Sequence, residues 1–186
     1  MTNKLVIEAA SKKDFEGYFE IMKEAFPPAE YRPKEKQYAI LEDPDYTVTL
    51  ARLDGEICGF IAAWRLDGFL FIEHLAVSSG LRGRGVGSLF VKEYKSSAIL
   101  PLVLEVENLQ DDVSLRRIEF YKRLGFTLSD ICYDQPNFQK YEKTIPLRIM
   151  YCENEHPLDV AKLKDEIFKK VYKKNDRENN LCTIRP

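Results

Sequence analysis

Apolar positions in the N-terminal quarter of the chain predict a short strand followed by two helices. A strand pattern covers residues 4–8, and Ser11 with Asp14 three residues later has the pattern of a capping box at a helix start. Apolar and aromatic side chains then recur at helical spacing until Pro27, which cannot continue a helix. After a proline-rich loop, residues 34–42 have the boundaries of a second, short helix.

The next segment has the pattern of a three-stranded meander. Runs rich in β-branched and aromatic residues cover 46–53, 56–66 and 69–77. Asp-Gly dipeptides at 54–55 and 67–68 separate these runs, and Asp-Gly is a strong signal for a tight hairpin turn. We therefore predict three consecutive antiparallel strands.

A glycine-rich turn, a helix and a buried strand follow the meander. Helical spacing begins at Val86 and extends to about Ser96, and residues 101–107 read as a strand. A strand, a crossover helix and a second strand form a parallel unit, so the strands at 69–77 and 101–107 are predicted to be parallel neighbours. The sheet is therefore predicted to be mixed.

The last third of the chain alternates between helix and strand patterns. Ser114 can cap a helix that ends at Gly125, a residue suited to a left-handed C-cap. Strands are predicted at 126–133 and 146–152, and Pro157 is expected to open a final helix.

Together these elements predict an α/β (α+β) fold. We expect a mixed, mostly antiparallel central sheet of about seven strands, with helices on both faces and an extra C-terminal helix. A chain of 186 residues suits a single domain, which we place at 1–174, ahead of a polar tail at 175–186. Hydrophobic residues at 45% and charged residues at 31% are close to globular averages and argue against disorder.

Charge and apolar patterning narrow the partners. A formal net charge of −2 gives no general attraction to nucleic acid or anionic membranes. The longest apolar stretch, 98–104, contains Pro101 and is far shorter than the roughly 20 residues of a bilayer span. The N-terminus lacks a signal-peptide core, so we expect a cytoplasmic protein. The cysteines are scattered without a C-x-x-C pair, which predicts packed free thiols and no metal site.

Four glycines within residues 80–87 lie between a strand and a helix. Glycine lets backbone N–H groups point toward a ligand, and a helix N-terminus attracts anions, so this turn is a candidate anion cradle. It is not a P-loop, because Val86 and Gly87 occupy the positions of the required Lys and Ser or Thr. It is not a dinucleotide fingerprint either, because Phe90 stands where the third glycine belongs.

Three features coincide over residues 69–126. They are the strand Phe-Ile-Glu-His-Leu-Ala-Val at 71–77, the turn Arg-x-x-Gly-x-Gly at 82–87, and Phe-Tyr-Lys-Arg-Leu-Gly-Phe at 120–126. In order and spacing they resemble the cofactor-binding core of the GNAT superfamily of N-acetyltransferases. The resemblance implies transfer of an acetyl group from acetyl-CoA, as co-substrate, to a primary amine.

The resemblance also implies which residues hold acetyl-CoA. Backbone amides of one continuous run would bind the pyrophosphate: Arg82, Gly83, Arg84, Gly85, Val86, Gly87 and Ser88. Backbone groups of Leu75, Ala76 and Val77 would pair with pantetheine in a gap where this strand splays from 101–107. Many family members carry an asparagine seven residues before the helix tyrosine. That position is Ser114 here, with Asn108 farther upstream, and either could contact pantetheine.

Two side chains are candidates for the chemistry of transfer. A lysine-like amine is only about 1 part in 2,500 unprotonated at pH 7, so a proton acceptor is needed, and Glu73 on the central strand is the candidate. Tyr121 occupies the family's general-acid position, and a phenol can protonate the leaving thiolate. Glu73 could instead be a salt-bridged strand residue and Tyr121 a core tyrosine. His74 follows Glu73, so strand alternation places it on the opposite face, in a packing role. We expect direct transfer in a ternary complex.

The acceptor groove is the least determined part of the site. Family resemblance places it between the first helices and the last hairpin, where Tyr31, Arg32, Tyr133 and Tyr141 could line it. A small-molecule amine is the expected acceptor. A protein N-terminal or lysine acetyltransferase and a non-catalytic acyl-CoA-binding sensor are the alternatives. A homodimer is compatible with the sequence, which does not determine the oligomeric state.

Overall fold

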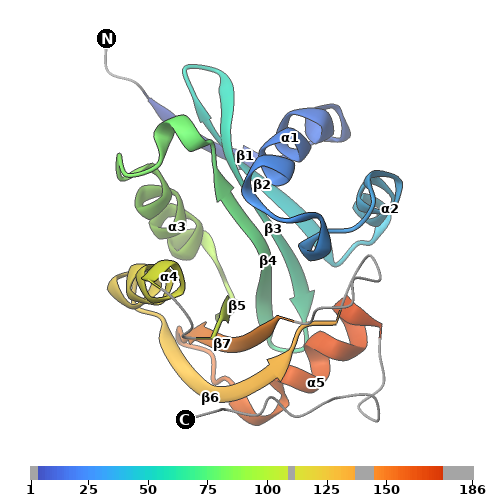
Figure 1. Ribbon diagram of the computed structural model, residues 1–186, viewed down its shortest axis with the longest axis vertical. Coiled ribbons are helices and arrows are strands. Elements are labelled where there is room, and N and C mark those ends of the chain that lie inside the picture. The colour runs from blue at the N-terminus through green and yellow to red at the C-terminus, as the bar shows by residue number, and fades with distance from the viewer. Residues whose placement is uncertain (1–3, 109–111, 137–144, 174–186) are drawn as a thin grey trace.

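The computed structural model describes residues 4–108, 112–136 and 145–173, which form a central β-sheet with helices on both faces (Figure 1). The strand order is β1-β2-β3-β4-β5-β7-β6, and every neighbouring pair is antiparallel except β4 and β5. The strands are β1 (Leu5–Ala9), β2 (Tyr46–Leu53), β3 (Glu56–Leu66), β4 (Phe69–Val77), β5 (Leu102–Glu107), β6 (Thr127–Asp134) and β7 (Pro146–Cys152). The predicted α/β class with a mixed, mostly antiparallel sheet is confirmed.

Helices alternate with these strands along the described chain. The α-helices are α1 (Phe15–Ala25), α2 (Lys34–Ala39), α3 (Val86–Ser97), α4 (Asp112–Arg123) and α5 (Leu163–Ile167). Short 3-10 turns cover Lys12–Asp14, Pro28–Glu30, Ile40–Glu42, Ser79–Leu81 and Val160–Lys162. A π-helical turn, Phe168–Tyr172, continues α5. We call the stretch from Val160 to Tyr172 the C-terminal helical segment.

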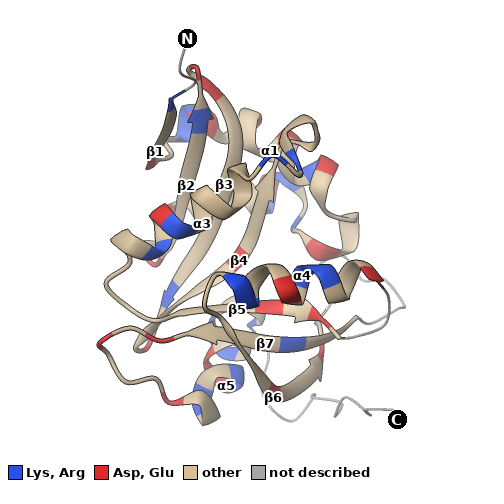
Figure 2. Ribbon diagram, turned by 90° about the vertical axis from the view of Figure 1, so that its left-hand side faces the viewer, with Lys and Arg blue, Asp and Glu red and all other residues tan. Residues whose placement is uncertain are grey.

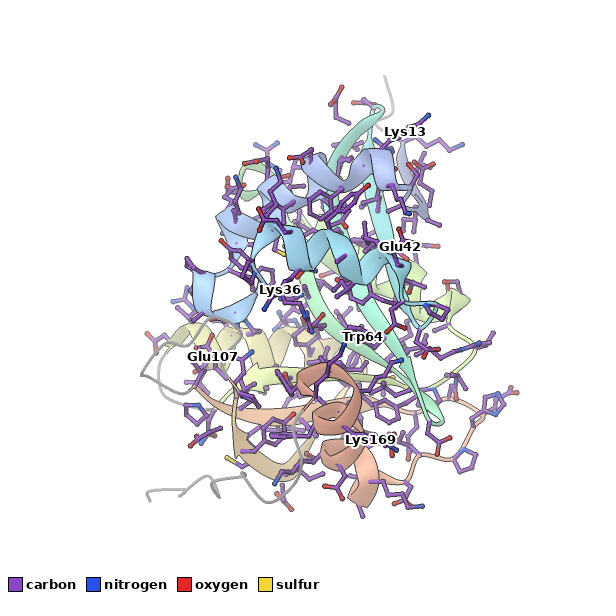
Figure 3. All side chains as sticks on the ribbon, turned by 90° about the vertical axis from the view of Figure 1, so that its right-hand side faces the viewer. Lys13, Lys36, Glu42, Trp64, Glu107 and Lys169 are labelled. Atoms are coloured by element: carbon purple, nitrogen blue, oxygen red, sulfur yellow. The ribbon has the colours of Figure 1, made fainter. Side chains whose placement is uncertain are left out.

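The sheet separates two hydrophobic layers. Phe19 of α1 and Phe168 of the C-terminal helical segment belong to one buried cluster, which also contains Trp64 of β3. Phe90 of α3 and Ile118 of α4 belong to the other. Figure 3 shows Trp64 on the face covered by α1, α2 and the C-terminal helical segment. Side chains on both faces of the central strands therefore pack into a hydrophobic core.

Local signals place most boundaries. The Asp14 carboxylate accepts hydrogen bonds from the N–H and hydroxyl of Ser11, at 2.8 and 2.7 Å, so the predicted capping box is present at the 3-10 turn before α1. Gly125 follows α4 with φ of +87°, the left-handed conformation expected of a C-cap. The predicted bounds of β2, β3, β4 and β7 are confirmed.

Two predicted helix starts are wrong. α4 begins at Asp112, so Ser114 lies inside its first turn and is buried rather than acting as the N-cap. The last helix begins at Val160 instead of Pro157 and has only a short α-helical part. The preference of a single capping residue is weak compared with tertiary packing, which buries Ser114 within α4 and Leu163 within the last helix.

The surface charge and the helices bear on the sequence expectations about nucleic-acid and membrane partners. Figure 2 shows acidic and basic residues interspersed over α3 and α4, with no extended field of one sign on that side. Among the described residues, none of the helices combines the length and the apolar character that crossing a bilayer requires.

Cys58 and Cys152 are buried free thiols. Cys132 is disulfide-bonded, so the expectation of free thiols is wrong at that position.

Candidate active site

A β-bulge in β4 lies at Glu73. His74 pairs with Ala62 of β3 and Ile72 pairs with Ala63, so Glu73 is an extra residue without a partner in this register. A bulge interrupts the alternation of side chains along a strand. Glu73 and His74 therefore point to the same face, the one that carries α1, and the expectation that they face opposite sides is wrong.

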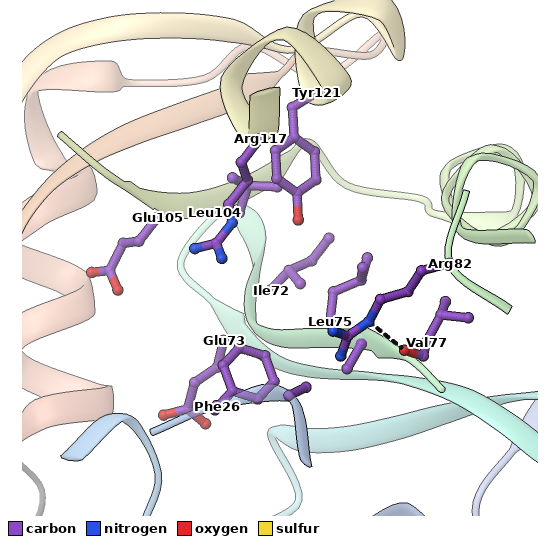
Figure 4. Close-up of a pocket in the computed structure, with 12 residues that line it drawn as sticks. Phe26, Ile72, Glu73, Leu75, Val77, Arg82, Leu104, Glu105, Arg117 and Tyr121 are labelled. Carbon is purple, nitrogen blue, oxygen red and sulfur yellow. Dashed lines mark hydrogen bonds between the residues drawn. The ribbon is translucent and has the colours of Figure 1, made fainter. Parts of the chain in front are cut away.

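Pairing between β4 and β5 stops just before this bulge. The last parallel pair is Ile72 with Leu104, and beyond it a cavity of about 350 Å³ opens between the two strands. Its walls come from β4, β5, the middle and C-terminal part of α4, the end of α1 and Arg82 of the glycine turn, and Figure 4 shows the residues involved. The predicted splay of the two strands is thus a feature of the fold.

The glycine turn has the backbone geometry of an anion cradle. Gly83 and Gly85 have φ of +74° and +81°, which side chains with a Cβ rarely adopt, and α3 begins directly afterwards at Val86. The first amides of a helix have no acceptor within the helix, and they carry the positive end of its dipole. Arg82 lines the cavity, and its Nε lies 3.4 Å from the carbonyl oxygen of Val77 (Figure 4). This contact joins the glycine turn to the end of β4, beside the cavity.

Tyr121 reaches the cavity from α4. Figure 4 shows its hydroxyl pointing into the space between the strands. Its ring packs edge-on against Phe120 and Phe126, with centroids 5.1 and 5.5 Å away. Burial raises the pKa of Tyr121 to about 12, with Arg117 opposing this shift, so the phenol carries its proton at neutral pH.

Two of the candidate pantetheine contacts, Ser114 and Asn108, lie outside the lining of this cavity. Ser114 is buried in the first turn of α4, and the backbone N–H of Asn108 donates to the carbonyl oxygen of Pro146 at 2.9 Å. Neither residue lines the space beside Tyr121. Their contact with pantetheine stays a prediction.

Glu73 forms a buried ion pair. Its Oε1 accepts from Arg32 Nη1 at 2.7 Å and its Oε2 accepts from Trp64 Nε1 at 3.0 Å. Both charged side chains are nearly buried, with 10% of Arg32 and 5% of Glu73 exposed. Arg32 also donates to the carbonyl oxygen of Val171 at 3.2 Å. Glu73 lines the cavity, and Arg32, predicted to line an acceptor groove, contacts its carboxylate.

A second carboxylate, Glu105, was missed by sequence reasoning. It follows Leu104 on β5, directly beyond the last pair with β4, and lines the same cavity. Its oxygens accept hydrogen bonds from the hydroxyls of Tyr133 and, at 2.7 Å, Tyr172. Burial raises the pKa of Glu105 to about 7, the two tyrosine hydrogen bonds oppose this, and the charge of Glu73 adds to it. A lone acidic residue inside the apolar run 102–106 was the available signal.

The remaining acceptor-groove candidates have diverse surroundings. Tyr31 is buried and packs edge-on against Phe19, with centroids 5.9 Å apart. Tyr133 is fully buried and holds Glu105 from β6. Tyr141 lies outside the described residues. Both of these tyrosines thus belong to the core, and the one at 133 also contacts a candidate proton acceptor.

Comparison with known proteins agrees with this site. The profile of the Acetyltransferase (GNAT) family matches residues 13–126, which is more than half of the chain. The matched region includes β4, the glycine turn and Tyr121 on α4. This protein belongs to the GNAT acetyltransferase family.

Individual relatives support the same class. YjbC of Bacillus subtilis (strain 168), provisionally named an acetyltransferase, is 29% identical over 111 residues, which cover 59% of this chain and 56% of that protein. The chain thus spans about half the length of this curated relative. A structure provisionally described as an acetyltransferase of the GNAT family, from Bacteroides thetaiotaomicron, has a TM-score of 0.81 and 29% identity, over 90% of this chain and 98% of the other.

A third similarity concerns the co-substrate. The structure of YncA from Salmonella typhimurium, described with its cofactor acetyl-CoA, has a TM-score of 0.59 and 20% identity. It covers 84% of this chain and 98% of that one. At this identity the likeness shows the fold alone, and the fold is one that accommodates acetyl-CoA in that protein.

Proposed function

We propose that this protein transfers an acetyl group from acetyl-CoA to a primary amine of a small molecule, by direct attack in a ternary complex. The observation that carries the proposal is the cavity between the splayed strands β4 and β5. It brings a buried phenol, Tyr121, together with two carboxylates, Glu73 and Glu105. An acid and a base in one cavity suit a reaction that removes a proton from an amine and returns one to a thiolate.

The residues of the cavity fit acetyl-CoA as a substrate. The edge of β4 that faces β5 has no strand partner beyond Ile72 in the described chain, so backbone groups of Leu75, Ala76 and Val77 can pair with the amides of pantetheine. In the run from Arg82 to Ser88, the amides of Arg82 and Arg84 already donate to the carbonyl oxygens of Ser79 and Leu81. The other amides lie at, or just before, the N-terminus of α3 and can bind the pyrophosphate. Each charge-assisted hydrogen bond to a phosphate contributes roughly 1.5–3 kcal/mol.

Glu105 is the better proton acceptor of the two carboxylates. A general base works best when its pKa lies near the operating pH, and burial places that of Glu105 at about 7. Glu73, the candidate from the sequence, is already paired with Arg32 and Trp64. We therefore assign the proton transfer to Glu105 and a binding and orienting role to Glu73.

Tyr121 is proposed to supply the proton for the leaving group. Its high pKa keeps the phenol protonated, and its hydroxyl points into the cavity (Figure 4). The CoA thiol has an ordinary thiol pKa near 8.5, below that of this phenol, so proton transfer to the thiolate is completed when the phenolate regains a proton from solvent. Donation by Tyr121 lowers the cost of expelling that thiolate.

A thiol-release screen tests the function. Acetyl-CoA is supplied with alkylamines, polyamines, amino acids, aminoglycosides and short peptides, and free CoA is measured with a thiol reagent. We expect release with at least one small amine and intersecting double-reciprocal lines. Parallel lines would refute direct transfer, and preference for peptides would indicate a protein acetyltransferase. Stabilisation by acetyl-CoA without release from any amine would indicate a non-catalytic acyl-CoA-binding protein.

A further inference from the structure

A second cavity, of about 60 Å³, adjoins the one that contains Tyr121. Both cavities are lined by Phe26, Glu73, Glu105 and Arg117. The larger cavity also contains the proposed acyl-CoA contacts, and the smaller one does not. A molecule in the smaller cavity could therefore contact the two carboxylates without overlapping the proposed acetyl-CoA contacts.

The walls of the smaller cavity carry excess negative charge. Four carboxylates line it: Glu30, Glu73, Glu105 and Glu107. Arg32 pairs with one of them, Glu73, at 2.7 Å, and Arg117 pairs with another, Glu107, at 3.0 Å. Within the described residues the other two form no ion pair, and burial raises the pKa of both. A cation in this cavity would offset their charge.

His74 provides a second, independent indication of a ligand. Its Nε2 lies 2.9 Å from the carbonyl oxygen of Glu30, which can only accept, so Nε2 must carry the hydrogen. Burial lowers the pKa of His74, so the ring is neutral and Nδ1 is a bare acceptor. This Nδ1 is buried, has no hydrogen-bond partner, and lies 3.8 Å from Oε2 of Glu73. Two acceptors thus face each other without a donor between them.

We propose that this cavity binds the protonated amine head of the acceptor, and that the acceptor is an unbranched, cationic primary amine. A primary ammonium group has three N–H donors. Glu73, Glu105 and His74 all line the cavity, and their side chains carry acceptors that can match these donors, the two carboxylates and the buried Nδ1. The inference rests on the proposed acetyl transfer and specifies its substrate class.

The proton and electron balance of the step follows from this placement. One ammonium proton passes to Glu105, which frees the nitrogen lone pair to attack the thioester carbonyl. The C–N bond forms, the C–S bond breaks, the nitrogen releases its second proton to solvent, and the proton of Tyr121 passes to the sulfur. Transfer from Glu105 back to the phenolate through solvent restores both groups.

Cavity size and charge together define the selectivity. About 60 Å³ accommodates only a few water-sized groups, so an unbranched aminomethyl end fits the cavity better than a branched one. A carboxylate beside the reacting nitrogen would meet the acidic walls and be repelled. We therefore expect alkylamines and diamines to be preferred over amino acids and branched amines.

Steady-state kinetics at saturating acetyl-CoA test the inference. The kcat/KM values of propylamine and 1,3-diaminopropane are compared with those of isopropylamine and β-alanine, and we expect the first two to be higher. The informative variant is His74→Gln, whose amide can still donate to the Glu30 carbonyl but lacks the Nδ1 acceptor. His156→Gln is the matched control, because His156 is exposed. We expect His74→Gln to raise the KM of propylamine about tenfold, the loss of one hydrogen bond to a charged group, with the KM of acetyl-CoA and the thermal midpoint nearly unchanged.

The outcomes separate this inference from the proposed function. Turnover of peptides or amino acids without turnover of propylamine would overturn the inference and leave acetyl transfer intact, as would an unchanged propylamine KM in His74→Gln. Absence of thiol release with every amine would overturn the function. In that case calorimetric titration with propylammonium chloride still tests the cavity, where binding supports it and no binding refutes it.

Discussion

The hydroxyl of Tyr172 donates a hydrogen bond to Oε2 of Glu105 at 2.7 Å. Tyr172 is the last residue of the π-helical turn that continues α5, so the C-terminal helical segment, which lies beyond the family match, supports a residue of the active site. A hydrogen bond to a carboxylate stabilises its ionised form and lowers its pKa. The C-terminal helical segment thereby influences the protonation of the proposed base.

This relationship predicts the pH dependence of catalysis. Glu105 has a pKa of about 7 and acts as a base only when ionised, so kcat/KM should fall as the pH decreases through about 7. Tyr172→Phe removes one hydrogen bond to the charged form of Glu105 and therefore raises its pKa. The fall of kcat/KM on the acidic side of the pH profile, here called the acidic limb, should then move to higher pH. A pH–rate profile of both proteins measures the shift.

Glutamine substitutions provide the controls for this limb. Glu105→Gln should lower turnover by roughly 10²–10⁴ and abolish the acidic limb, whereas Glu73→Gln should retain the limb. An acidic limb that survives in Glu105→Gln would show that another group takes the proton.

Tyr121→Phe should reduce turnover by roughly 10²–10⁴, because it removes the proposed proton donor and little else. The affinity for acetyl-CoA should stay nearly constant, since the proposed contacts to the cofactor are backbone groups. Single-turnover kinetics and calorimetric titration with acetyl-CoA measure the two quantities. Unchanged turnover would remove Tyr121 from the mechanism.

The ion pair between Arg32 and Glu73 predicts a stability effect. Arg32→Leu leaves the Glu73 carboxylate buried without its cation, which should lower the free energy of unfolding by about 3–5 kcal/mol. Adding Glu73→Gln to this variant removes the unpaired charge and should restore part of the loss. Urea unfolding of both variants tests the prediction. Equal losses in the single and double variants would contradict it.

The glycine turn offers a matched pair of substitutions. Gly85 has φ of +81°, so Gly85→Ala strains the turn by about 1–2 kcal/mol and displaces the amides at the start of α3. Gly80 needs no left-handed backbone, and a Cβ there would meet no atom within 4 Å. We expect at least a tenfold weaker Kd for acetyl-CoA in Gly85→Ala and little change in Gly80→Ala. Similar affinities in the two variants would exclude the turn as the pyrophosphate site.

Local sequence signals account for much of the fold. The bounds of β2, β3 and β4 follow from alternation and from the Asp-Gly dipeptides between them, because these features act over a few neighbouring residues. The parallel pairing of β4 with β5 follows from the crossover rule. The glycine turn and Tyr121 follow from spacing, which is also local.

Tertiary structure decided the electrostatics of the site. Neither alternation nor propensity locates the bulge at Glu73, because it is set by the register with β3 and turns His74 toward the same face. Arg32 reaches Glu73 across the fold. Glu105 acquires its raised pKa only when the folded chain buries it, and the two tyrosines that moderate this rise, Tyr133 and Tyr172, come from distant segments. By itself, the sequence determined the family, the sheet and the position of the glycine turn, since these depend on short-range patterns. Which carboxylate can act as the base, and which amine can reach it, depends on burial and on contacts between distant residues, and those exist only in the folded chain.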